Sequence, residues 1–346
     1  MKRCSYKRRI YLERINHKRT RRKEKRIRKG RNSAKVITYA KNWDYIIQAP
    51  ELLSLEGEKN RSDCVRFIKN LGKYCAEDNK RVLVDFTRTD RLISDGTLMF
   101  RAYLCKAVSD KSASTVIKCR QSRNLKINEV LKQIGVFELL GQHPKITPHH
   151  KDVINWRYAQ GAGALGEKYE DILGQYDGAI TDALKDGLYV GLTEAMTNTR
   201  QHAYPDSEND EDYYSGVNEW WMFSQEMGNR LYVVFCDLGV GIPGSLPSKR
   251  PNLWKNIKQK FGSAPQDSKI IEEAIKYSQT RTEEKHRGKG LKQLTNVLEN
   301  TLGGILYVHS NHGCYTSREG EIATYDYRNS ISGTLISWSL PLSELT

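Results

Sequence analysis

The chain has 346 residues, of which 38% are hydrophobic and 28% charged, and its formal net charge is +15. This length accommodates two ordinary domains with buried cores, and the composition excludes collagen-like, disulfide-framework and wholly disordered classes. Because no stretch approaches the roughly 20 apolar residues that cross a bilayer, and no apolar segment follows the basic start, we expect neither a membrane span nor a secretory signal. We therefore expect a cytoplasmic globular protein.

The positive charge is concentrated at the N-terminus. Residues 1–36 hold 17 Lys and Arg against two Asp and Glu, so the remaining 310 residues carry 39 of the 56 basic and 39 of the 41 acidic groups. Like charges at this density oppose burial, and we expect a flexible basic arm. Three interpretations stay open: binding to nucleic acid or another polyanion, a solubilising or ribosome-proximal tail, and a serine-poor organelle transit peptide.

The seven cysteines are scattered and include no C-x-x-C pair. Because zinc sites are usually built from closely spaced ligand pairs, we expect buried, reduced thiols rather than a zinc site or a catalytic cysteine.

From about residue 43, strands and helices are predicted to alternate. The apolar run 81–86 and the run 114–119 predict strands, whereas 96–108 and the amphipathic stretch 127–140 predict helices. Such alternation is typical of an α/β layer. The order of these elements resembles a STAS domain, as in anti-sigma-factor antagonists.

This resemblance covers residues 37–143 and implies a protein partner. STAS domains carry a D-S-S-G loop whose serine is phosphorylated, and the corresponding loop here is Ile93-Ser94-Asp95-Gly96. The motif is degraded, so three interpretations remain: Ser94 accepts phosphate, Asp95 supplies a permanent negative charge, or both residues are purely structural.

Residues 144–177 are predicted to form a connector. They contain a formal G-x-G-x-x-G at 161–166, but the sequence continues into a predicted helix without a second strand, which favours a turn or linker over a dinucleotide site. His149 and His150 are predicted to be a solvated pair, because no further ligands stand at metal-binding spacing.

The stretch 178–203 predicts a helix with one buried face. Glu194, Asn198 and His202 recur at intervals of four, which places them on one stripe of that helix. A carboxylate followed one turn later by an amide suits a Mg²⁺–nucleotide site. The amide oxygen is a hard ligand for Mg²⁺, and the carboxylate can orient or deprotonate a water.

A second candidate group follows the predicted strand 231–236. Asp237 ends this strand, and Gly239 and Gly241 come directly after it. A carboxylate at a strand end can accept a hydrogen bond from an exocyclic amine, and the glycines allow the backbone to pass close to a flat ring.

A third group lies before the amphipathic run 291–300. Arg287-Gly288-Lys289-Gly290 opens this predicted helix, where unpaired backbone N–H groups and the basic side chains suit an anion such as a phosphate. The remaining runs, 304–309 and 333–340, predict strands.

The motifs E-x-x-x-N-x-x-x-H, D-x-G-x-G-I, G-x-G-L and a final G-T before a strand, in this order, resemble the GHKL (Bergerat-fold) ATPase superfamily. That superfamily includes the catalytic domains of histidine kinases and anti-sigma-factor kinases. The resemblance covers residues 178–346. It implies a two-layer α/β sandwich, a mixed sheet covered by helices, with a lid over 244–286.

The same resemblance implies ATP and Mg²⁺ as ligands. It assigns ATP binding to Asn198, Asp237, Gly239, Gly241, Gly288, Lys289, Gly290 and Thr334. In this assignment Asn198 ligates Mg²⁺, Asp237 receives the adenine amino group and Thr334 supports the adenine. The two glycines after Asp237 shape the adenine pocket, and the 288–290 turn holds the phosphates from the lid. Glu194 is the candidate base for a hydrolytic water or a substrate hydroxyl.

The function that follows is a nucleotide-dependent switch or ATPase in a bacterial regulatory or defence system. Two alternatives stay open: a Ser/Thr protein kinase of the anti-sigma-factor type, and a non-hydrolysing nucleic-acid-binding adaptor that uses residues 1–36. A classical histidine kinase is not expected, because no helix carrying a phosphoacceptor histidine precedes the first motif. The sequence leaves the oligomeric state open.

Overall fold

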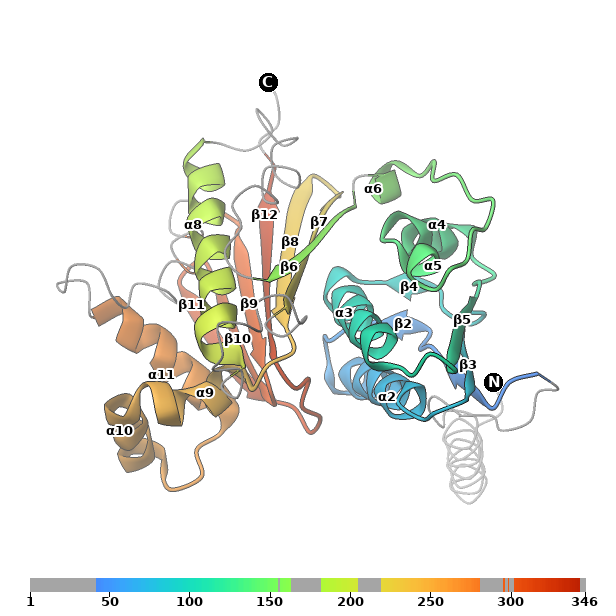
Figure 1. Cartoon of the computed structure of the whole chain (residues 1–346). Coiled ribbons are helices and arrows are strands. Elements are labelled where there is room, and N and C mark those ends of the chain that lie inside the picture. The colour runs from blue at the N-terminus through green and yellow to red at the C-terminus, as the bar shows by residue number, and fades with distance from the viewer. Residues whose placement is uncertain are drawn as a thin grey trace, which may run out of the picture.

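The structure is a computed structural model with an α/β fold that contains one parallel and one antiparallel sheet of three or more strands (Figure 1). It describes residues 42–154, 156–162, 182–204, 219–280, 295, 298 and 302–342. Within these residues, no helix is both long enough and apolar enough to cross a membrane.

The N-terminal unit is built on a parallel sheet in the order β1-β3-β5. Its strands are β1 (Tyr45–Gln48), β3 (Arg81–Asp85) and β5 (Val116–Arg120), and two short strands, β2 (Leu52–Leu53) and β4 (Arg91–Leu92), pair beside it. All residues of β3 after the first are buried, as expected for a parallel strand covered on both faces. The strands predicted over 81–86 and 114–119 are thus confirmed.

The helices of this unit are α2 (Glu58–Cys75), α3 (Ser94–Asp110), α4 (Leu125–Gln133), α5 (Val136–Leu139) and α6 (Lys151–Ile154). The single helix predicted over 127–140 is wrong, because Gly135 adopts a left-handed conformation (φ 71°) that ends α4 and starts α5. Asn124 caps α4 by accepting the backbone N–H of Lys126.

The C-terminal unit contains a seven-stranded sheet in the order β11-β10-β9-β12-β8-β7-β6. Its strands are β6 (Arg157–Ala162), β7 (Glu219–Met227), β8 (Arg230–Asp237), β9 (Ile305–Ser310), β10 (Gly313–Arg318), β11 (Glu321–Asp326) and β12 (Thr334–Pro341). Every neighbouring pair is antiparallel, so the mixed sheet expected from the resemblance is not found. One reason is local: Gly228 and Asn229 both have φ of 58°, the conformation of a tight hairpin turn between β7 and β8.

The edge strand β6 lies in the segment predicted to be a connector. Gly161 and Ala162, which begin the formal G-x-G-x-x-G, pair with Trp220 and Glu219 of β7. This part of the motif is therefore strand, and residues 163–166 lie outside the described residues.

The helical elements whose bounds the structure describes in the C-terminal unit are α8 (Asp182–Asn198), the π-helical η2 (Thr199–Ala203), α9 (Gly241–Lys249), α10 (Pro251–Phe261) and α11 (Asp267–Thr280). The described part of the lid predicted over 244–286 consists of α9, α10 and α11. These helices share an apolar core that includes Leu246, Ile257 and Ile270. This part of the segment is therefore a packed helical layer rather than a loop.

Both faces of the central strands β7, β8 and β12 are buried, whereas the edge strand β11 is largely exposed. Trp220, Phe235 and Trp338 point to one face and pack with residues of α8 and α11, whereas Trp221 and Cys236 point to the other and join the core of the N-terminal unit. The sheet thus lies between the helices α8 and α11 and the N-terminal unit, whose helix α3 contacts β7, β8 and β12 (Figure 1). This alternation explains why these strands are apolar on both sides.

Candidate functional site

The end of η2, the π-helical turn that follows α8, and the loop after β8 are joined by hydrogen bonds. The N–H of Val240 donates to the carbonyl of Ala203 at 2.8 Å, and the N–H of Leu238 donates to the hydroxyl of Tyr204 at 3.1 Å. Because Ala203 ends η2 and Asp237 ends β8, two of the motif-bearing elements meet at the same end of the sheet, beside α9 (Figure 1).

Asp237 is buried at this end of the sheet, with 6% of its surface exposed. It pairs with Thr334 across β8 and β12, and its carboxylate accepts the backbone N–H groups of Gly239 (2.9 Å) and Thr334. Burial raises its pKa to about 6, although both hydrogen bonds oppose this shift. A carboxylate offers about four acceptor positions, so Asp237 can accept further donors.

The two glycines after Asp237 are required by close contacts within the protein itself. A Cβ atom on Gly239 would lie 2.2 Å from the carbonyl oxygen of Ala203. Gly241 has φ of 75°, and a Cβ there would lie 2.7 Å from Oγ of Ser310. The structure thus explains both glycines without a flat ring beside them.

Ser310 and Asn311 hold the same loop from the opposite side. Oγ of Ser310 accepts the N–H of Ile242 at 2.8 Å and lies 3.1 Å from Oγ1 of Thr334, and Nδ2 of Asn311 donates to the carbonyl of Val240 at 2.8 Å. The loop after β8 is therefore fixed between η2 on one side and the ends of β9 and β12 on the other.

Glu194 and Asn198 are half-buried, and their side chains are hydrogen-bonded, as their spacing predicts. Burial raises the pKa of Glu194, and the hydrogen bond from Asn198 opposes this shift. Because an ionised carboxylate only accepts, Asn198 donates through its NH₂ group, which directs its amide oxygen away from Glu194.

His202 does not simply continue this stripe. Residues 199–203 form a π-helical turn, which is wider than an α-helical turn, so a spacing of four no longer places His202 directly over Asn198. Burial lowers the pKa of His202, and the nearby charges of Lys249 and Arg250 lower it further. We expect a neutral imidazole here.

Three residues of this site were missed by reasoning from sequence: Tyr204, Ser310 and Asn311. Each is an ordinary polar residue at the end of an element, and Ser310 and Asn311 follow the predicted strand 304–309 directly. The signal that the sequence offered for Ser310 and Asn311 was two polar residues directly after a predicted strand. Gly288, Lys289, Gly290 and the basic arm 1–36 lie outside the described residues.

Ser94 and Asp95 are both 6% exposed where α3 begins, and they line a small cavity of about 70 Å³ that faces the seven-stranded sheet. Asp95 accepts the backbone N–H groups of Leu55 (3.0 Å) and Gly96. These bonds fit the structural interpretation of the loop 93–96, since they tie α3 to the segment after β2.

Asp95 should make stability fall as the pH rises. Burial raises its pKa to about 6, above the value of about 3.9 of an unfolded chain, so the folded state binds its proton more tightly. This contribution is complete below about pH 4 and is lost as the pH rises through about 6. Asp95→Asn, measured by urea unfolding at pH 4.5 and 7.5, should flatten this decline.

Burial also raises the pKa of Asp237, so part of the decline of stability with rising pH should remain in Asp95→Asn. Because asparagine has one carbonyl oxygen for two N–H donors, Asp95→Asn also loses stability equally at every pH. The readout is therefore the change in the free energy of unfolding between pH 4.5 and 7.5, not its value at one pH. The exposed Asp90→Asn is the control, and an Asp95→Asn slope equal to that of the wild type would contradict the prediction.

Comparison with models of known protein families finds no match, and comparison with curated proteins finds no significant match either.

Proposed function

We propose that the protein binds ATP with Mg²⁺ at the end of the seven-stranded sheet and acts as a nucleotide-dependent switch or ATPase. The observation that carries this proposal is the position of Asp237. It is a buried carboxylate, paired with Thr334, in a loop bonded to the end of the helix that bears Glu194 and Asn198. The resemblance to GHKL ATPases rests on these same residues.

The chemistry of these residues fits a purine triphosphate. The Asp237 carboxylate retains acceptor positions for an exocyclic amino group, and its two backbone bonds fix its orientation. The amide oxygen of Asn198 is a suitable Mg²⁺ ligand, and bound Mg²⁺ would neutralise phosphate charge. Burial raises the pKa of Glu194, which makes its carboxylate a stronger base. Gly288, Lys289 and Gly290 would hold the phosphates.

One assay separates this function from its alternatives. Purified protein is incubated with γ-labelled ATP and Mg²⁺, and free phosphate and labelled protein are followed together. Phosphate release that Glu194→Gln abolishes supports an ATPase, and label on a protein supports a kinase. Binding without either supports the adaptor. Label on Ser94 would require the two units to separate, because Ser94 is buried.

Asp237→Asn should weaken ATP binding by about 1.5–3 kcal/mol, which is roughly 10- to 150-fold in Kd, because a charge-assisted hydrogen bond is lost. Isothermal titration calorimetry measures this change, and thermal unfolding checks that the variant is folded. Asp186→Asn, an exposed change on α8, should leave the affinity unaltered. If Asp237→Asn binds ATP as tightly as wild type, the assignment of the pocket is wrong.

A further inference from the structure

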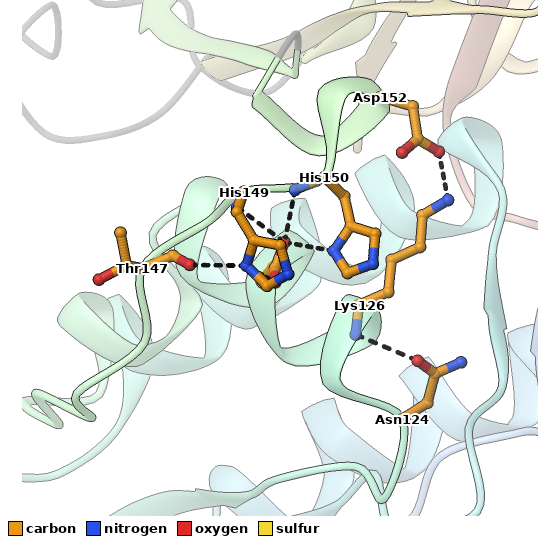
Figure 2. A network of polar contacts seen from close by, with 7 residues as sticks. Asn124, Lys126, Thr147, His149, His150 and Asp152 are labelled. Atoms are coloured by element: carbon orange, nitrogen blue, oxygen red, sulfur yellow. Dashed lines mark hydrogen bonds and ion pairs between the residues drawn. The ribbon is translucent and has the colours of Figure 1, made fainter.

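Two histidines and a glutamate meet on α4, away from the site described above. Nδ1 of His149 lies 2.8 Å from Oε1 of Glu129, and Nδ1 of His150 lies 2.8 Å from Oε2. One ligand atom from each residue can be chosen so that all three lie within 4.8 Å of one another. The two rings lie side by side, with centroids 4.5 Å apart and planes tilted by 31° (Figure 2).

The carboxylate is buried and oriented, whereas the imidazoles reach solvent. The side chain of Glu129 is 3% exposed, against 71% for His149 and 38% for His150. Oε2 also accepts the backbone N–H groups of both histidines, at 3.1 and 3.2 Å. Burial opposes ionisation of Glu129, but the bonds from His150 and His149 outweigh it and hold its pKa below the usual value. A buried carboxylate therefore faces two imidazole nitrogens at an open surface.

We propose that Glu129, His149 and His150 bind a divalent transition-metal ion of the zinc class. Imidazole nitrogen and carboxylate oxygen are typical zinc ligands, and three protein ligands with an open fourth position make a known type of zinc site. Ligand atoms about 2.1 Å from a tetrahedral ion lie roughly 3.4 Å apart. The two contacts of 2.8 Å are shorter than this spacing and go to different carboxylate oxygens, so the imidazoles would turn outward and release the N–H protons that face Glu129 to admit the ion.

The ion would fasten the segment that leads to β6 onto α4. This segment is already held at two further points, by the ion pair of Lys126 with Asp152 and by the bond from Gln133 to the carbonyl of Trp156. Figure 2 shows the Lys126–Asp152 pair beside the histidines. Because Asp152 is engaged by Lys126, the proposed ligand set excludes it. A bound metal would thus strengthen the connection between the N-terminal unit and the edge strand of the seven-stranded sheet.

The test uses the full chain, stripped of metal with a chelator and titrated with Co²⁺, with Zn²⁺ in competition. We expect one equivalent to produce the visible absorption of a four- or five-coordinate Co²⁺ site, without the near-ultraviolet band of a thiolate ligand. His149→Ala and His150→Ala should each weaken binding about ten-fold or more, and the double variant should lose the band.

His143→Ala is the matched control, because His143 is an exposed histidine of the same segment outside the cluster, and it should bind Co²⁺ like the wild type. Zn²⁺ should also raise the melting temperature of the wild type and not that of the double variant. The histidine variants keep Glu129 and the two backbone N–H groups that it accepts, and circular dichroism checks that they are folded. No saturable binding by the wild type, or the same binding by the double variant, would overturn the proposal.

Discussion

Arg61→Ala should lower the free energy of unfolding by about 4 kcal/mol. Arg61 lies on α2 and is 0% exposed, and its guanidinium crosses to the C-terminal unit. It donates to the carbonyl oxygens of Asn311 (2.7 Å) and Asn329 (3.0 Å), contacts Nδ1 of His309 at 3.1 Å, and lies 4.3 Å above the ring of Tyr327.

Three effects add in this variant. The two carbonyl groups lose their charge-assisted donors, the contact with the Tyr327 ring is lost, and a cavity forms between the units. Burial and, second, the Arg61 charge lower the pKa of His309 to about 3, so this pKa should rise when the Arg61 charge is removed. Because Asn311 also holds the carbonyl of Val240, the loop after β8 should loosen, and ATP affinity should fall with stability.

Urea unfolding followed by circular dichroism measures the loss of stability. Arg66→Ala is the matched control, because Arg66 is exposed on the same helix and pairs with nearby Asp63. Its effect should stay within about 0.5 kcal/mol. Equal effects of the two substitutions would show that the buried guanidinium does not join the units.

Gly239→Ala should lower the free energy of unfolding by about 3 kcal/mol. The added Cβ would lie 2.2 Å from the carbonyl oxygen of Ala203 and 2.6 Å from both its carbonyl carbon and its Cβ, so the clash is with rigid atoms that cannot rotate away. That carbonyl is also the acceptor for Val240, and moving it breaks the bond between η2 and the loop. The variant should therefore also bind ATP more weakly than wild type.

The same substitution at Gly72 should have the opposite effect. Gly72 lies inside α2, and a Cβ built there would meet no described atom within 4 Å apart from its chain neighbours and the backbone of its own helix. Alanine at a helix interior stabilises by about 1 kcal/mol relative to glycine, so Gly72→Ala should raise the unfolding midpoint. If Gly239→Ala were as stable as Gly72→Ala, the close contact with Ala203 would not exist in solution.

Local patterns in the sequence were sufficient for most of the described elements. The runs 81–86, 231–236 and 333–340 are strands, because apolar and β-branched residues bounded by turns leave few alternatives. The spacing of Glu194 and Asn198 was likewise sufficient to predict that they meet on one helix. These predictions depend only on residues that are close together in the chain, so the local sequence is enough to predict the element.

Contacts between distant residues were decided only by the tertiary structure. Arg61 and Asn311 are 250 positions apart, and no local pattern distinguishes Arg61 from the other basic residues of the chain. Glu129 likewise follows an ordinary helical pattern, and its meeting with His149 and His150 arises from how the segment before α6 folds back. Burial of both faces of the central strands β7, β8 and β12 has the same origin. Pairing across the chain depends on which surfaces exclude water together, which is a property of the assembled fold and not of any single segment.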